Sequence, residues 1–141
     1  MPVDRARAER AVREFLLALG QDPDRDAELR GTPARVVEAY ESDLLSGYDV
    51  DVPALLAEGQ AISENTSSGL VALSGIAVST ICPHHLLLSN GSASVVYRPG
   101  SKLFGLGTLA ALVNAYARRL SLQESISESV AQALVQHGGA R

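Results

Sequence analysis

Residues 70–97 read LVALSGIAVSTICPHHLLLSNGSASVVY, and their pattern predicts antiparallel β-structure in the middle of the chain. The run 70–81 is rich in Val, Ile and Thr, which is typical of a strand. Two further apolar runs, 86–88 and 93–97, flank Asn90-Gly91, and an Asn-Gly pair between apolar runs is the strongest short signal for a hairpin. The sequence therefore predicts a β-hairpin that turns at Asn90-Gly91.

The tetrapeptide Cys82-Pro83-His84-His85 lies at the mouth of that hairpin and places the only cysteine beside two of the three histidines. In an extended strand the side chains of Cys82 and His85 would point to opposite faces. Pro83 suits the second position of a β-turn, and such a turn brings its first and fourth residues within about 7 Å between Cα atoms. Cys82 and His85 can then converge, while His84 is left free to point elsewhere.

Thiolate and imidazole are ligands that zinc favours, so Cys82 and His85 form a candidate metal pair. A catalytic zinc typically has three protein ligands and one open position for water, and the sequence offers no obvious third ligand. The alternative interpretation is structural, because a lone cysteine is most often a small buried hydrophobe. The tetrapeptide alone leaves both interpretations open.

Composition excludes several classes of partner. The formal net charge of −4 and the absence of a lysine-arginine block argue against nucleic acid, because phosphate contacts need clustered cations. The longest apolar run, around 69–78, is too short and too interrupted to span a membrane. One cysteine cannot form an internal disulfide, and the N-terminus lacks the apolar core of a signal peptide. We therefore expect a reducing, cytoplasmic location.

Residues 1–58 are predicted to form an N-terminal helical arm. Asp4 can cap a helix that ends at Gly20. Thr32 is a good N-cap for a second helix, which has a proline at its first position and ends at Gly47.

Residues 59–141 are predicted to form the main body of the protein. After the hairpin, apolar residues recur at helical spacing over 109–116 and again over 122–134, so two helices are expected there. His137 and the two glycines after it mark the end of the second helix, where a histidine complements the helix dipole.

The order of the motifs resembles the GTP cyclohydrolase I family, whose usual signature is Cys-Glu-His-His followed by a Gln-Glu pair. The resemblance covers nearly the whole chain apart from residues 58–68. It is carried by Thr32-Pro33-Ala34-Arg35-Val36, Ser46-Gly47-Tyr48, Cys82-Pro83-His84-His85, Tyr97-Arg98-Pro99, Lys102, Gly105-Leu106 and Tyr116-Ala117-Arg118-Arg119-Leu120-Ser121-Leu122-Gln123-Glu124.

This resemblance implies an α+β subunit of the tunnelling fold (T-fold), in which an antiparallel sheet carries two helices on one face, with the helical arm before it. It implies a homo-oligomer, usually a decameric ring. It also implies a zinc-dependent enzyme that hydrolyses GTP at C8, releases formate and forms 7,8-dihydroneopterin triphosphate. The closing β-hairpin of the fold is not found in this chain, so the sequence is either a fragment of a longer product or a truncated relative.

The resemblance also implies roles for individual residues. Cys82 and His85 would be zinc ligands, and His84 would transfer a proton near the imidazole ring of guanine. Gln123 and Glu124 would recognise the guanine edge. In addition, Arg35 would reach the triphosphate bound in a neighbouring subunit.

Three departures from the family pattern accompany the matches. Pro83 stands where the family usually has Glu, and its side chain can neither carry charge nor hydrogen-bond. Gly107, Thr108 and Ala111 stand where the family usually has a Ser-Lys pair and an Arg that hold the triphosphate. The third zinc ligand of the family is a cysteine in a His-x-Cys segment of a later strand, and no such segment is found up to Arg141.

Three alternative interpretations stay open. Ser121-Leu122-Gln123-Glu124 fits a capping box, in which Glu124 would only stabilise the start of the last helix. Residues 105–110 fit a dinucleotide-binding fingerprint, which we disfavour because the preceding strand belongs to a hairpin and not to a βαβ unit. The third alternative is a non-catalytic family member that binds a purine or pterin, or serves as an assembly subunit.

Overall fold

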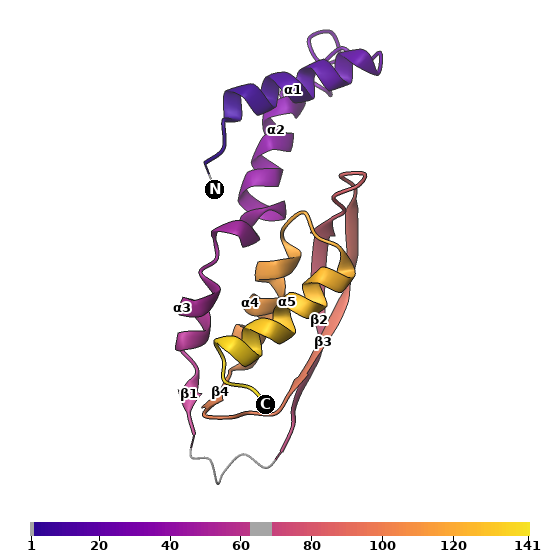
Figure 1. The fold of residues 1–141 in the computed structure, drawn as a ribbon. Coiled ribbons are helices and arrows are strands. Elements are labelled where there is room, and N and C mark those ends of the chain that lie inside the picture. Colours follow the sequence, from indigo (N-terminus) through magenta and orange to yellow (C-terminus); the bar gives the residue numbers. More distant parts are fainter. Residues whose placement is uncertain (1, 63–68) are drawn as a thin grey trace. The chain divides into compact units, whose positions relative to one another are not determined.

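The computed structural model describes residues 2–62 and 69–141 (Figure 1). The chain divides into two compact units, with the boundary in the sequence between Ser46 and Gly47. The helices are α1 (Arg5–Ala18), α2 (Thr32–Ala39), a π-helical turn η1 (Tyr40–Leu44), a 3-10 turn η2 (Ser46–Asp49), α3 (Val52–Ala57), α4 (Leu106–Ala117) and α5 (Gln123–Gln136). The strands are β1 (Gln60–Ala61), β2 (Val71–Ile81), β3 (Leu88–Tyr97) and β4 (Lys102–Leu103). Among the described helices, none has the length and apolar character needed to cross a membrane.

The first unit contains the helix pair α1 and α2. Asp4 caps α1 as predicted, because its Oδ1 accepts a hydrogen bond of 3.0 Å from the Arg7 amide. Gly20 follows the helix with a positive φ of 78°, a conformation in which glycine has no Cβ penalty. The predicted N-cap of α2 is wrong by one residue: Gly31, also at positive φ, is the cap, and Thr32 is already helical.

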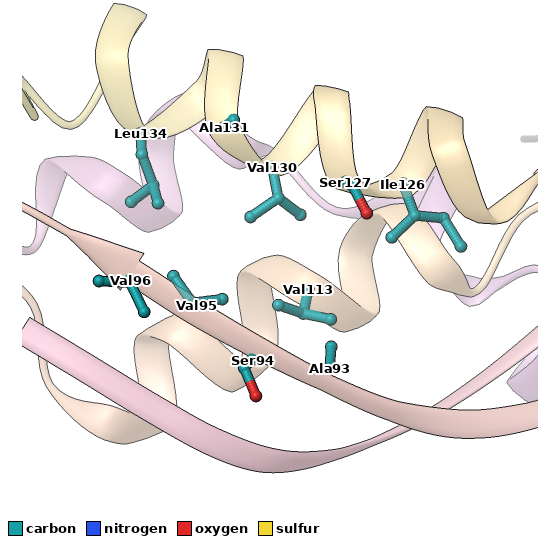
Figure 2. A pocket seen from close by; sticks show the side chains of 10 residues that line it. All are labelled: Ala93, Ser94, Val95, Val96, Val113, Ile126, Ser127, Val130, Ala131 and Leu134. Atoms are coloured by element: carbon teal, nitrogen blue, oxygen red, sulfur yellow. The ribbon is translucent and has the colours of Figure 1, made fainter.

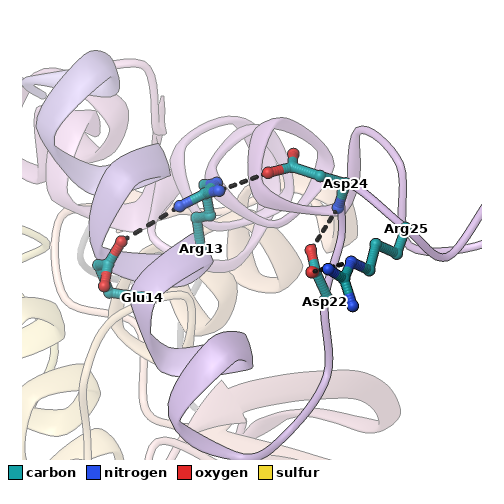
Figure 3. Close-up of polar contacts among 5 residues, drawn as sticks. All are labelled: Arg13, Glu14, Asp22, Asp24 and Arg25. Carbon is teal, nitrogen blue, oxygen red and sulfur yellow. Dashed lines mark hydrogen bonds and ion pairs between the residues drawn. The ribbon is translucent and has the colours of Figure 1, made fainter.

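The loop between α1 and α2 is held by exposed polar contacts (Figure 3). Arg13 pairs with Asp24 and with Glu14, and the Arg25 Nε lies 3.5 Å from an Asp22 carboxylate oxygen. Asp22 also accepts a hydrogen bond of 2.9 Å from the Asp24 amide. The hydrogen bond with Asp24 raises the pKa of Arg13, so this guanidinium stays charged. Such exposed pairs shape the loop but add little stability.

The second unit is built on an antiparallel hairpin of β2 and β3, with pairing that runs from Val71↔Tyr97 to Ile81↔Leu88. The predicted turn at Asn90-Gly91 is wrong, because Asn90 and Gly91 lie inside β3 opposite Ser79 and Val78. The chain instead turns at residues 82–87. Nine registered pairs along the hairpin outweigh the local preference of a single Asn-Gly dipeptide.

Helices α4 and α5 pack against one face of this hairpin (Figure 1). Their apolar spacing was predicted from the sequence and is confirmed, and it supplies most of the buried core. The mixed helix and strand arrangement agrees with the predicted α+β class. The core contains Ile76, Val95 and Tyr97 from the hairpin, Leu109, Leu112 and Val113 from α4, Ile126, Val130 and Leu134 from α5, and Val52 and Leu56 from α3.

The short strands β1 and β4 pair antiparallel, with Gln60 opposite Leu103. Because β4 is antiparallel to its partner and directly precedes α4, the described part of the second unit has no βαβ unit here, which removes the dinucleotide-binding interpretation of residues 105–110. The division into an arm of residues 1–58 and a core of residues 59–141 stays a prediction. In the structure α3 is part of the second compact unit.

Candidate functional site

The turn between β2 and β3 carries the Cys-Pro-His-His tetrapeptide. The Leu86 amide donates a hydrogen bond of 2.8 Å to the Cys82 carbonyl, and the Cys82 amide donates one of 2.9 Å to the Leu87 carbonyl. The turn is therefore one residue longer than the β-turn expected from Pro83. Leu86 completes it at a φ of +56°, which is unusual for a residue with a branched side chain.

The turn brings the side chains of Cys82 and His85 together. The Cys82 Sγ lies 3.8 Å from the His85 Nδ1. The His84 ring stands at 82° to the His85 ring, with 6.3 Å between the two centroids. His84 therefore remains outside the thiol–imidazole contact, as the sequence predicted.

The separation of the two donor atoms fits a shared zinc ion. Zinc–sulfur and zinc–nitrogen bonds of about 2.3 and 2.0–2.1 Å at a tetrahedral angle place the two donor atoms about 3.6 Å apart. The contact between Cys82 and His85 matches this value to a few tenths of an ångström. Within the described residues, however, no group of three or more His, Cys, Asp or Glu side chains is arranged to hold a metal. The turn thus brings together two side chains of the types that zinc favours, and their role as ligands stays a prediction.

The environment of Cys82 favours the thiolate. The hydrogen bond with the His85 side chain lowers the pKa of the Cys82 thiol, and hydrogen bonds from the backbone of His84 and His85 lower it further. A thiolate is the form that binds metal.

The segment between α4 and α5 lies beside the end of β2. Ile81 and Leu120 form an isolated parallel bridge, and the Ser121 amide donates a hydrogen bond of 3.1 Å to the Ile81 carbonyl. Ile81 directly precedes Cys82. The bridge therefore places the segment that leads into α5 next to the strand end from which the turn begins.

Gln123 and Glu124 form the first turn of α5, and the structure rejects the capping-box interpretation. The N-cap residue is Leu122, which has no side-chain capping bond. The Ser121 hydroxyl instead donates to the Tyr116 carbonyl at 3.2 Å. Glu124 is exposed, and its carboxylate makes no hydrogen bond with any described residue. This carboxylate is available to a ligand.

Arg35 belongs to the first compact unit, on the first turn of α2. Its guanidinium donates to the Thr32 hydroxyl at 2.8 Å and to the carbonyls of Arg30 at 3.1 Å and Glu28 at 3.3 Å. These contacts fasten the preceding loop. The predicted role of Arg35 toward a triphosphate stays a prediction.

A pocket of 160 Å³ lies between β3 and α5 (Figure 2). Ile126, Val130 and Leu134 of α5 point toward the strand, and none of the predicted site residues lines the pocket. Ligand pockets commonly measure about 300–1,000 Å³. This apolar space is therefore part of the packing between β3 and α5 and is too small for a nucleotide.

Arg119 is a residue whose role the sequence did not predict. From the sequence alone, Arg118 and Arg119 fit cations near a helix C-terminus, where the helix dipole favours positive charge. In the structure, Arg119 contacts the backbone of Gly47, 72 positions earlier in the chain. No spacing rule within one element could have indicated that contact.

Comparison with known proteins agrees with the resemblance. The sequence model of the family described as GTP cyclohydrolase I matches residues 8–141. The chain is 43% identical over 131 residues to GTP cyclohydrolase 1 of Hyperthermus butylicus, which covers 93% of this chain and 63% of the relative. It is 41% identical over 140 residues to the Mycobacterium ulcerans enzyme of the same name, covering 98% of this chain and 67% of the relative.

A third relative, GTP cyclohydrolase 1 of Campylobacter lari, is 38% identical over 133 residues, which cover 94% of this chain and 68% of the relative. The chain thus spans about two thirds of the length of these relatives. It belongs to the GTP cyclohydrolase I family.

Proposed function

We propose that this chain acts as a zinc-dependent GTP cyclohydrolase I, which hydrolyses GTP at C8, releases formate and forms 7,8-dihydroneopterin triphosphate. The observation that carries the proposal is the 3.8 Å contact between the Cys82 thiol and the His85 imidazole, with the His84 ring outside it. Family membership makes this arrangement a candidate for hydrolysis and not only for structural zinc binding.

Cys82 and His85 would hold the zinc ion. When bound, zinc supplies a nucleophile from water at neutral pH. A catalytic zinc needs one more protein ligand than the described residues bring to the turn.

The neighbouring side chains would bind the substrate and transfer protons. An imidazole suits proton transfer near neutral pH, and His84 would act in this way on the imidazole ring of the purine. The exposed Glu124 carboxylate would accept hydrogen bonds from the N–H groups on the guanine edge, with Gln123 beside it. Arg35 would contact the triphosphate in an assembled homo-oligomer, which we propose to be a T-fold ring located in the cytoplasm.

The proposal is tested by incubating the purified chain with GTP and zinc, followed by oxidation and dephosphorylation, and measuring neopterin fluorescence. We expect neopterin from the unaltered chain and a loss of about 100-fold or more in His84→Gln, because general acid–base groups contribute about 10²–10⁴-fold. His137→Gln is the matched control, since His137 is exposed at the opposite end of α5. Absence of neopterin from a zinc-loaded chain that binds GTP would contradict the proposed activity.

A second candidate function is supported by two observations. The described residues supply two metal donors, and Gly107, Thr108 and Ala111 occupy the positions where the family usually carries phosphate-binding groups. Each lost charge-assisted contact costs about 1.5–3 kcal/mol. A non-catalytic member would bind a purine or pterin, or join an assembly, without turnover. Binding of GTP with no neopterin formed would favour this function.

A further inference from the structure

Arg119 lies in the segment that joins α4 to α5, and its side chain is held on several sides. Its Nε donates to the Ala115 carbonyl at 2.7 Å and to the Gly47 carbonyl at 3.2 Å, and its Nη2 donates to Gly47 at 2.9 Å. Its Cζ lies 4.8 Å from the centroid of the Tyr116 ring and 5.4 Å from that of Tyr48. Cation–π contacts of this kind stabilise a partly buried guanidinium.

Gly47 permits the close approach that these contacts require. A Cβ at this position would lie 2.5 Å from the Ala115 carbonyl oxygen and 2.8 Å from that of Arg118. The Gly47 amide donates to the Arg118 carbonyl at 3.0 Å, and the next residue, Tyr48, accepts a hydrogen bond of 3.3 Å from the Leu120 amide. We call the group formed by Gly47, Tyr48, Tyr116 and Arg119 the Arg119 clasp.

The backbone of the same segment is tied to β2. The Arg119 carbonyl accepts hydrogen bonds from the Ile81 amide at 3.5 Å and from the Thr80 hydroxyl at 3.3 Å. The Ser121 amide donates a hydrogen bond of 3.1 Å to the Ile81 carbonyl. The Arg119 side chain thus fastens the segment to α4, while its backbone lies against the residue that precedes Cys82.

We propose that Arg119 is a positioning residue, which holds Gln123 and Glu124 in a fixed place relative to the Cys82–His85 turn. The inference rests on the proposed function, because it assumes that Glu124 and the Cys82–His85 turn act on the same bound purine. Its physical basis is that residues 119–121 are held both by the clasp and by the hydrogen bonds and the bridge to Ile81. A shift of this segment moves the start of α5 relative to the turn.

The chemistry of the contacts assigns this role to an arginine. Nε and Nη2 are occupied by backbone carbonyls, so the guanidinium serves the fold and does not replace the phosphate-binding cations. A lysine would keep the charge but would lose the planar fork that binds two carbonyls and stacks on two rings.

Equilibrium binding of GTP and inosine triphosphate (ITP) tests the proposal. ITP lacks the 2-amino group of guanine, which would donate a hydrogen bond to the Glu124 carboxylate. A site that binds such an N–H group discriminates against an analogue that lacks the group. In Arg119→Leu we expect affinity for GTP to fall about tenfold and affinity for ITP to fall less than about threefold. The GTP/ITP ratio should then approach that of Glu124→Ala, with Arg119→Lys intermediate. Arg10→Leu, which alters an exposed arginine of α1, is the matched control.

Equal losses of GTP and ITP affinity in a folded Arg119 variant would overturn the proposal, because they indicate a merely structural role. If Arg119→Leu does not fold, Arg119→Lys decides in its place. If the unaltered chain binds neither nucleotide, the proposed function fails. Amide hydrogen exchange in the Arg119 variant then tests whether the Arg119 clasp holds the segment between α4 and α5. Faster exchange at Ser121 and Ile81 in the variant supports it, and unchanged exchange contradicts it.

Discussion

At the scale of single residues, a substitution of Glu124 distinguishes guanine recognition from helix capping. Its exposed carboxylate caps nothing, and near a helix N-terminus a negative charge contributes about 0.3–1 kcal/mol. Glu124→Gln should therefore lower the free energy of unfolding by less than about 1 kcal/mol. Affinity for GTP should fall about tenfold or more, because charge-assisted hydrogen bonds contribute about 1.5–3 kcal/mol. Calorimetric binding and denaturant unfolding measure the two effects.

Glu128→Gln is the matched control for Glu124→Gln, because Glu128 is an exposed glutamate on the same helix, and its carboxylate accepts a hydrogen bond of 3.4 Å from Gln132. Equal GTP affinities in the two variants would contradict the recognition role of Glu124. A large loss of stability in Glu124→Gln alone would restore the capping interpretation.

Residue-level prediction from sequence depended on how local the contact was. Cys82 and His85 are three positions apart, and the presence of Pro83 between them was enough to predict that their side chains converge. The contacts of Arg119 with Gly47 and Tyr48 join distant parts of the chain, so residue type and spacing could not indicate them. The rejected capping box failed because the Ser121 hydroxyl bonds to Tyr116 instead.

At the scale of elements, the turn between β2 and β3 places Leu86 in the left-handed region at φ +56°. An L-residue pays about 1–2 kcal/mol in this conformation, whereas glycine adopts it freely. We expect Leu86→Gly to raise the free energy of unfolding by about 0.5–1 kcal/mol, measured by urea denaturation. Leu87→Gly is the control: Leu87 is also exposed but has no positive φ, so the glycine should destabilise. Destabilisation by Leu86→Gly equal to that by Leu87→Gly would contradict the strain argument.

The helices were predictable because the apolar residues that recur at helical spacing are largely the residues that are buried in the core. The expected residues of α4 and α5 face the core, except that Leu122, the first position of the second stripe, is the exposed N-cap residue of α5. The position of the hairpin turn was not predictable, since Asn90-Gly91 carries a strong local signal that the longer ladder of β2 and β3 overrides. Strand register is set by pairing between elements, which no short window of sequence contains.

At the scale of the whole molecule, family membership is shown over nearly the whole chain, and the role of the 82–85 turn stays a prediction. The match to the family extends over residues 8–141 and so covers nearly all of both compact units. Within the second unit, the 82–85 turn, the Ile81 bridge and the start of α5 are linked by consecutive backbone contacts. The central claim is that Cys82 and His85 share one zinc ion while His84 stays unligated.

X-ray absorption spectroscopy of the zinc-loaded chain tests this claim most directly. We expect one sulfur neighbour at about 2.3 Å and nitrogen at about 2.0–2.1 Å from zinc. The sulfur signal should disappear in Cys82→Ser, the nitrogen signal should weaken in His85→Gln, and the spectrum should be unchanged in His84→Gln. A zinc shell without sulfur in the unaltered chain, or one that changes when His84 is replaced, would contradict the account.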